Sequence, residues 1–158
     1  MEVKVKKSQI SGEINCPPSK SYSHRAILIS ALASGKSHIK NVLLSRDTLA
    51  SVNCIKMLGV NVTSLDSGGD HATILGFDKS ENQQSHNMKT KNDMTGFVGT
   101  QDLFVESNGG LRGFKTPNDV LNADNSGTTI RITTSMCSLV SDKSESVPVT
   151  GNASIFKR

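Results

Sequence analysis

The stretch Pro18-Ser19-Lys20-Ser21-Tyr22-Ser23-His24-Arg25 runs directly into the apolar segment Ala26-Ile27-Leu28-Ile29, and the two together predict the start of a helix. A helix start presents unpaired backbone N–H groups and the positive end of the helix dipole. Lys20 precedes this start and Arg25 lies one turn inside it, with no acidic residue between them. The stretch therefore predicts an anion site, with phosphate as the favoured ligand. A serine cap with two solvated cations is the plainer alternative.

The composition bounds what kind of protein this is. With 158 residues the chain is one ordinary domain or part of a larger protein. Apolar residues make up 35% of it, below the usual share of about 45–50%, and residues 78–102 are nearly all polar. The formal charge of +4 comes from scattered basic residues with almost no aromatic residues among them. Small anionic ligands explain this charge as well as nucleic acid does, and we expect no nucleic-acid partner.

The cysteines and histidines argue against a metal centre. Cys16, Cys54 and Cys137 are widely spaced and odd in number, which indicates reduced thiols in a cytosolic protein rather than disulfides or a zinc site. Four histidines also lack metal-ligand spacing and are expected at the surface or in loops: His24, His38, His71 and His86. No segment has membrane length, and no targeting segment opens the chain. We expect a cytoplasmic monomer with no membrane partner, no metal and no cofactor.

The hydrophobic pattern predicts an α/β (α+β) fold of short alternating helices and strands. Residues 4–14 are expected to be extended, with Gly12 between two short strands. A first helix is expected from about Ser21 to Ser34, ended by Gly35. Its apolar face has four members: Ile27, Leu28, Ala31 and Leu32. A strand over 37–44 and a second helix over 47–58 follow, the helix capped by Ser45 or Asp47 and closed by Gly59.

The second half of the chain contains a hairpin, a polar segment and a third helix. Residues 60–63 and 71–75 flank a Ser-Gly-Gly turn, which predicts the hairpin. Residues 78–101 are interpreted as a mobile surface insertion, after which a strand is expected at 103–106. The third helix opens near Gly127, and a short strand is expected over 147–150.

A second motif, Asn125-Ser126-Gly127-Thr128-Thr129-Ile130-Arg131, opens that third helix. Gly127 and Arg131 are four residues apart, like Ser21 and Arg25 in the first helix. A side chain four residues into a helix leans back towards its start, so both arginines could point at an anion held there. This weak repeat suggests a duplicated βαβ scheme. The alternative is a capped helix with a glycine for tight packing.

The two motifs occur together with Asp47, Thr150-Gly151 and Lys157-Arg158, in that order along the chain. In combination they resemble the N-terminal part of the 5-enolpyruvylshikimate-3-phosphate synthase family. The resemblance covers about residues 12–76 and 102–158. Asp47 itself is interpreted first as a helix cap and only second as a functional carboxylate.

The resemblance implies repeated βαβαββ units that form part of one lobe of a two-lobed enzyme. Residues 1–11 would be a strand belonging with the other lobe, and residues 12–158 a partial substrate-binding lobe with the insertion at about 78–101. The implied reaction transfers the enolpyruvyl group of phosphoenolpyruvate to the 5-hydroxyl of shikimate 3-phosphate and releases phosphate. It proceeds through a tetrahedral intermediate without metal or cofactor.

The resemblance also implies site residues. Lys20 would lie between both ligands and act in catalysis, while Ser21 and Arg25 would hold shikimate 3-phosphate. Gly127, through its backbone, and Arg158 would contact phosphoenolpyruvate. The loop around this glycine would be shaped by two more residues of the motif: Asn125 and Arg131.

The chain departs from the family pattern at its end. It stops after Arg158, where the pattern continues with proline, at well under half of the usual length. The acid–base residues and cations of the other lobe would lie beyond it, so we expect a fragment that is inactive alone and needs the missing C-terminal lobe. Two alternatives stay open. One is the related UDP-N-acetylglucosamine enolpyruvyl transferase, which usually has Asn where this chain has Ser21. The other is a non-enzymatic anion- or nucleic-acid-binding domain.

Overall fold

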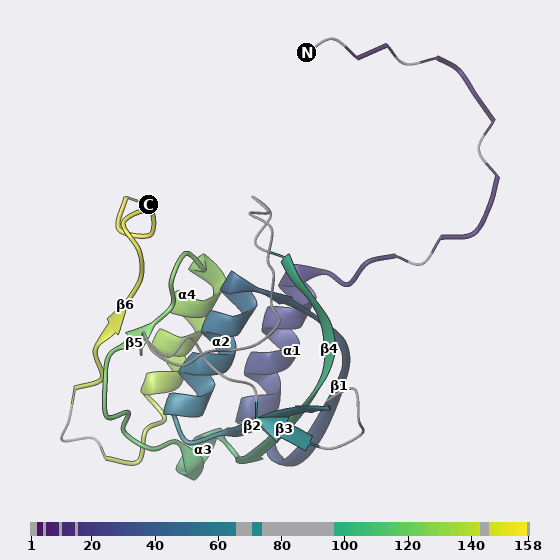
Figure 1. The fold of residues 1–158 in the computed structure, drawn as a ribbon. Helices are drawn as coiled ribbons and strands as arrows, with labels where there is room; N and C mark the ends of the chain where they lie inside the picture. Colours follow the sequence, from purple (N-terminus) through teal and green to yellow (C-terminus); the bar gives the residue numbers. More distant parts are fainter. Residues whose placement is uncertain are drawn as a thin grey trace, which may run out of the picture.

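The computed structural model describes residues 3–4, 6–9, 11–14, 16–65, 71–73, 97–142 and 146–157. This part of the chain contains both helices and strands, which confirms the predicted mixed α+β class (Figure 1). The described residues among 3–14 lie in neither helix nor strand, and this segment extends away from the other elements. The two short strands expected there are therefore not present in its described part.

The elements have the following bounds: α1 (Lys20–Leu32), β1 (Ser34–Ser45), α2 (Arg46–Met57), β2 (Asn61–Leu65), β3 (His71–Thr73), β4 (Phe97–Asn108), α3 (Gly110–Gly113), β5 (Leu121–Asn122), α4 (Gly127–Cys137) and β6 (Val149–Thr150). The three predicted helices correspond to α1, α2 and α4, and the predicted hairpin corresponds to β2 and β3. Hydrophobic period and local turn residues were therefore sufficient to locate these elements.

The strands form two sheets. β1, β4, β2 and β3 make a four-stranded antiparallel sheet in that order. Because β1 and β2 are both antiparallel to β4, they run parallel to each other, and α2 connects them. β5 and β6 pair in parallel, with α4 as their connection. The chain thus contains two strand–helix–strand units, in agreement with the duplicated βαβ scheme.

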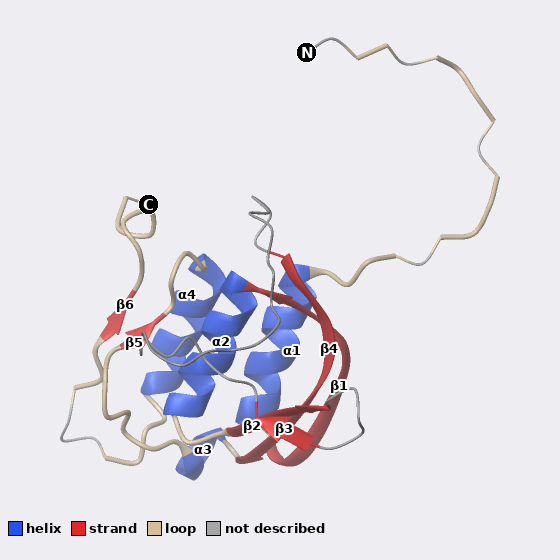
Figure 2. Cartoon of the chain, in the orientation of Figure 1, coloured by secondary structure: helices blue, strands red, loops and turns tan. Residues whose placement is uncertain are grey.

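The helices α1, α2 and α4 lie side by side between the larger sheet and the β5–β6 pair (Figure 2). α1 contacts β1 and β4, while α2 contacts β5 and α4 contacts β6. Fully buried side chains from helices, strands and the connecting loops fill the space between these layers: Ile27, Val52, Ile55, Leu58, Val62, Leu103, Phe114 and Leu121. This core holds the starts of the three helices at one end of the layer.

Some boundaries differ from the prediction. α1 ends at Leu32, which is 39% exposed, and Gly35 (φ +100°) lies inside β1 rather than ending the helix. Gly59 (φ +90°) does close α2, as predicted. The polar insertion was expected to reach residue 101, but β4 begins at Phe97, and residues 78–96 lie outside the described residues. Pairing with β1 brings the polar start of β4 into the sheet despite its composition.

Candidate functional site

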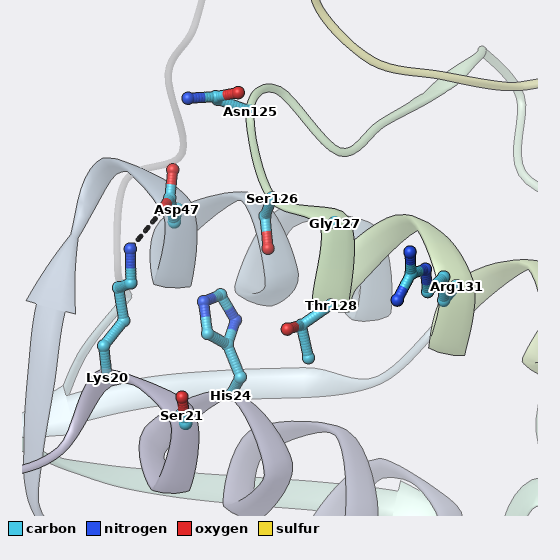
Figure 3. Close-up of a pocket in the computed structure, with 9 residues that line it drawn as sticks. All are labelled: Lys20, Ser21, His24, Asp47, Asn125, Ser126, Gly127, Thr128 and Arg131. Carbon is cyan, nitrogen blue, oxygen red and sulfur yellow. Dashed lines mark hydrogen bonds and ion pairs between the residues drawn. The ribbon is translucent and has the colours of Figure 1, made fainter. Parts of the chain in front are cut away.

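An open pocket of about 350 Å³ lies where the starts of α1, α2 and α4 meet (Figure 3). All its lining residues except one glycine have polar or charged side chains: Lys20, Ser21, His24, Asp47, Asn125, Ser126, Gly127, Thr128 and Arg131. Two of these helix starts are the ones that the sequence motifs predicted. Neither α1 nor α4 has an acidic residue in its first turn, so the dipoles of both favour an anion in this pocket.

Lys20 and Asp47 form an ion pair across the mouth of the pocket, with 2.7 Å between Nζ and Oδ2. The Lys20 side chain is 53% exposed and that of Asp47 22%. The expectation that Asp47 caps the second helix is wrong, because Ser45 is the N-cap: its side chain accepts from the Thr48 N–H, and Thr48 Oγ1 accepts from the Ser45 N–H at 2.7 Å. This capping box leaves the Asp47 carboxylate in the pocket, where it opposes the Lys20 charge.

The α4 side of the pocket is formed by the loop and first turn that begin at Asn125. Ser126 caps α4 by accepting a hydrogen bond from the Thr129 N–H at 3.1 Å. Gly127 is the first residue of the helix, and Arg131 lines the pocket one turn further along. The Asn125 side-chain oxygen accepts a hydrogen bond from Ser154 Oγ. The second sequence motif is thus a capped helix start whose backbone faces a pocket.

Beneath the pocket, hydroxyl groups connect the three helices. His24 Nδ1 lies 2.8 Å from Ser51 Oγ, and Ser51 Oγ lies 2.6 Å from Thr129 Oγ1. Thr129 Oγ1 donates to Ser126 Oγ at 2.7 Å. The expectation that the histidines are surface or loop residues is wrong for His24, which lies in α1 with 2% of its surface exposed. Burial lowers the pKa of His24, an effect that nearby Asp47 opposes and Lys20 reinforces.

One predicted site residue does not line the pocket, and a second is not among the described residues. Arg25 does not line the pocket: its Nε donates to the Ser21 carbonyl oxygen at 3.2 Å, and its guanidinium lies 4.6 Å from the centre of the Tyr22 ring. It therefore does not point at the helix start, although Arg131 does line the pocket. A cation–π contact on the exposed face of α1 explains this orientation. Arg158 lies outside the described residues.

Comparison with known proteins places this chain in a family. The family model for EPSP synthase (3-phosphoshikimate 1-carboxyvinyltransferase) matches residues 4–98. The chain belongs to the EPSP synthase family. It is 35% identical, over its whole length, to the 3-phosphoshikimate 1-carboxyvinyltransferases of Nitrosopumilus maritimus and Methanobrevibacter smithii, and it spans 28% of the length of each. The EPSP synthase from Acinetobacter baumannii has a similar fold, with a TM-score of 0.58 at 24% identity over 93% of this chain and 25% of that one.

Sequence reasoning missed His24, Ser126 and Thr128 as pocket residues. The sequence did contain a signal for His24, namely its helical spacing. It lies four residues after Lys20 and four before Leu28, so it shares a helix face with both. Ser126 and Thr128 flank the predicted Gly127, but only the packing of α4 against α1 and α2 brings them together with Lys20.

Within the described part of the chain, no helix is long and apolar enough to cross a membrane. The same residues contain no group of three or more His, Cys, Asp or Glu side chains placed to hold a metal ion. The titratable and charged side chains that line the pocket are Lys20, Asp47, His24 and Arg131, and they lie there together with hydroxyl and backbone groups.

Proposed function

We propose that the whole protein transfers the enolpyruvyl group of phosphoenolpyruvate to the 5-hydroxyl of shikimate 3-phosphate with release of phosphate. This chain would supply part of the substrate pocket. Family membership and the relatives named 3-phosphoshikimate 1-carboxyvinyltransferase support the proposal. The observation that carries it is the convergence of the α1 and α4 starts, with Lys20, Ser21 and Gly127, on one polar pocket.

Both proposed substrates are anions, and the pocket offers several kinds of donor. Lys20 would give up part of its ion pair with Asp47 to donate to the ligands, and its fixed charge would stabilise the negative charge of the adduct. The N–H groups of Gly127 and Thr128 belong to the first turn of α4, where helix N–H groups have no intrahelical acceptor. Hydrogen bonds to charged groups contribute about 1.5–3 kcal/mol each, so a few of them hold a phosphate well.

The remaining roles follow the family motif and stay proposals. Ser21, at the start of α1, would bind shikimate 3-phosphate through its hydroxyl. Arg25 would bind the same substrate only if its guanidinium moved away from the Tyr22 ring. Asn125 would shape the loop before Gly127, and Arg158 would contact phosphoenolpyruvate.

The proposal also includes groups that lie in the rest of the whole protein. A second lobe would supply the acid–base groups and exclude water when it closes over the substrates. We further propose a cytoplasmic location, which the three free thiols support because such thiols persist in a reducing compartment: Cys16, Cys54 and Cys137.

Calorimetric titration of the chain with shikimate 3-phosphate tests the proposal. Lys20→Met should weaken binding by about 10-fold to 100-fold, the loss of one charged hydrogen bond. Lys36→Met is the matched control: Lys36 pairs with Glu106 on the strands and does not line the pocket, so its loss should leave binding unchanged. Binding of UDP-N-acetylglucosamine instead of shikimate 3-phosphate would favour the related transferase and overturn the proposal.

Turnover gives a separate test. The chain alone should release no phosphate from phosphoenolpyruvate and shikimate 3-phosphate in a coupled assay, whereas the whole protein should. Substantial turnover by the chain alone would contradict the proposed need for a second lobe.

A further inference from the structure

His24 combines two properties that rarely occur together: it is almost fully buried, and it lines the anion pocket. In Figure 3 its imidazole lies between Lys20 and the first turn of α4, with one ring nitrogen on the side of Lys20 and Asp47. The other nitrogen, Nδ1, contacts Ser51 on α2. Nδ1 therefore faces α2, and Nε2 faces the pocket.

Counting protons along the hydroxyl chain assigns the tautomer of this histidine. Each hydroxyl has one proton to donate. Thr129 donates its proton to Ser126, so Ser51 must be the donor in the contact between Ser51 and Thr129. With its proton used there, Ser51 can only accept from His24, and Nδ1 must carry a hydrogen. In the neutral ring this leaves Nε2 as the unprotonated nitrogen, directed at the pocket.

We propose that His24 is a proton-accepting residue of this pocket, and that binding of a phosphate-bearing anion beside Lys20 places a proton on its Nε2. The lone pair of Nε2 forms the new N–H bond with a proton from a hydronium ion of the solvent, whose O–H bond breaks to leave a water molecule. The proposal deepens the proposed function, because it assumes that the pocket binds such an anion.

The charges around the ring support this coupling. Among the described residues, the charged groups that face the pocket are Lys20 from α1, Asp47 from α2 and Arg131 from α4, while Arg25 lies over Tyr22. Burial keeps the pKa of His24 below its ordinary value in the empty pocket. An anion near Nε2 favours the charged ring and raises this pKa, so ligand and proton must each strengthen the binding of the other.

A purely structural role is the competing explanation, in which His24 only ties α1 to α2. The variant His24→Asn separates the two roles. The amide nitrogen of asparagine can replace Nδ1 as donor to Ser51, but no group replaces Nε2. If the role is structural, His24→Asn should bind anions like the wild type at every pH.

The tautomer is tested first, without any ligand. A long-range proton–nitrogen NMR spectrum of the labelled chain above the pKa of His24 should show an Nδ1–H ring, and Ser51→Ala should allow a mixture of tautomers. An Nε2–H ring in the wild type would overturn the inference.

Proton uptake is tested by titrating wild type and His24→Asn with shikimate 3-phosphate in buffers of different ionisation enthalpy. Wild type should take up more protons than the variant. Its affinity advantage should grow as the pH falls and, once the pH is below the pKa of His24 in the empty pocket, should reach about tenfold for each unit by which binding raises that pKa. His38→Asn is the control, since His38 contacts Asp102 outside the pocket and its loss should change nothing.

Equal proton uptake by wild type and His24→Asn, with binding retained, would overturn the inference and leave the proposed function standing. Absence of binding by the wild type would overturn the proposed function and the proton uptake with it. The NMR experiment decides the tautomer in either case.

Discussion

Thr129→Val removes the central hydroxyl of the chain that ties α1, α2 and α4 together beneath the pocket. The two residues have nearly the same shape and similar helix propensity, so the change isolates the hydroxyl. Thr129 is fully buried, and its Oγ1 contacts Ser51 at 2.6 Å and donates to Ser126 at 2.7 Å. Valine would leave the Ser51 hydroxyl without its acceptor.

The expected cost follows from these contacts. A net hydrogen bond contributes about 0.5–1.5 kcal/mol, and a buried donor left without a partner costs about 1–3 kcal/mol. In the variant, Ser126 Oγ still accepts the hydrogen bond from the backbone N–H of residue 129 and loses only the bond from the Thr129 hydroxyl. We expect the free energy of unfolding to fall by about 2–4 kcal/mol, which lowers Tm by about 5–15 °C in a chain of this size.

Urea unfolding followed by circular dichroism measures this change. Thr134→Val is the matched control. Thr134 is exposed on the same helix, and its hydroxyl donates to the Ile130 carbonyl oxygen. Loss of this hydroxyl should lower the free energy of unfolding by less than about 0.5 kcal/mol. Equal stabilities for the two variants would refute the reasoning that the buried hydroxyl chain holds the helices together.

Three further outcomes are expected. Asp47→Asn removes a carboxylate from the pocket and should tighten the binding of inorganic phosphate about fivefold or more. The reason is that like charges about 4 Å apart repel by about 1 kcal/mol even in water. Weaker phosphate binding by calorimetry would contradict this. Burial raises the pKa of Cys54 to about 12, so a thiol reagent followed by mass spectrometry should label the exposed Cys16 and spare Cys54 until the chain unfolds. The unfolded state binds a proton at an ordinary histidine pKa of 6.5, whereas folded His24 has a lower pKa and binds the proton only at lower pH. Stability should therefore fall as the pH drops below about 6.5, and less steeply in His24→Asn; equal slopes would count against the buried neutral ring.

Local signals explain why much of the fold could be predicted. α2 follows a capping serine, Ser45, and is closed by Gly59, and both signals were visible in the sequence. The hairpin of β2 and β3 was equally visible, because the sequence has a Ser-Gly-Gly stretch, typical of a turn, between two segments with strand-like patterns. The start of β4 could not be predicted, because Thr100 and Gln101 are polar. They enter the sheet by pairing with Leu43 and Val42.

Part of the site could be predicted from the sequence, but its arrangement could not. The motifs identified Lys20, Ser21 and Gly127, which do line one pocket. The direction of Arg25 could not be predicted, because its contact with the Tyr22 ring competes with the pull of the helix start. The position of the Asp47 side chain depends on whether Ser45 or Asp47 caps α2, and the sequence allowed both.

The central claim is that the starts of α1 and α4 bind one anion together. Amide chemical shifts of the nitrogen-labelled chain, followed during titration with shikimate 3-phosphate, test it most directly. The amides of Ser21, Gly127 and Thr128 should shift along a single binding curve, because they border the same pocket. Shifts confined to one helix start, or spread over exposed lysines such as Lys36, would contradict the claim.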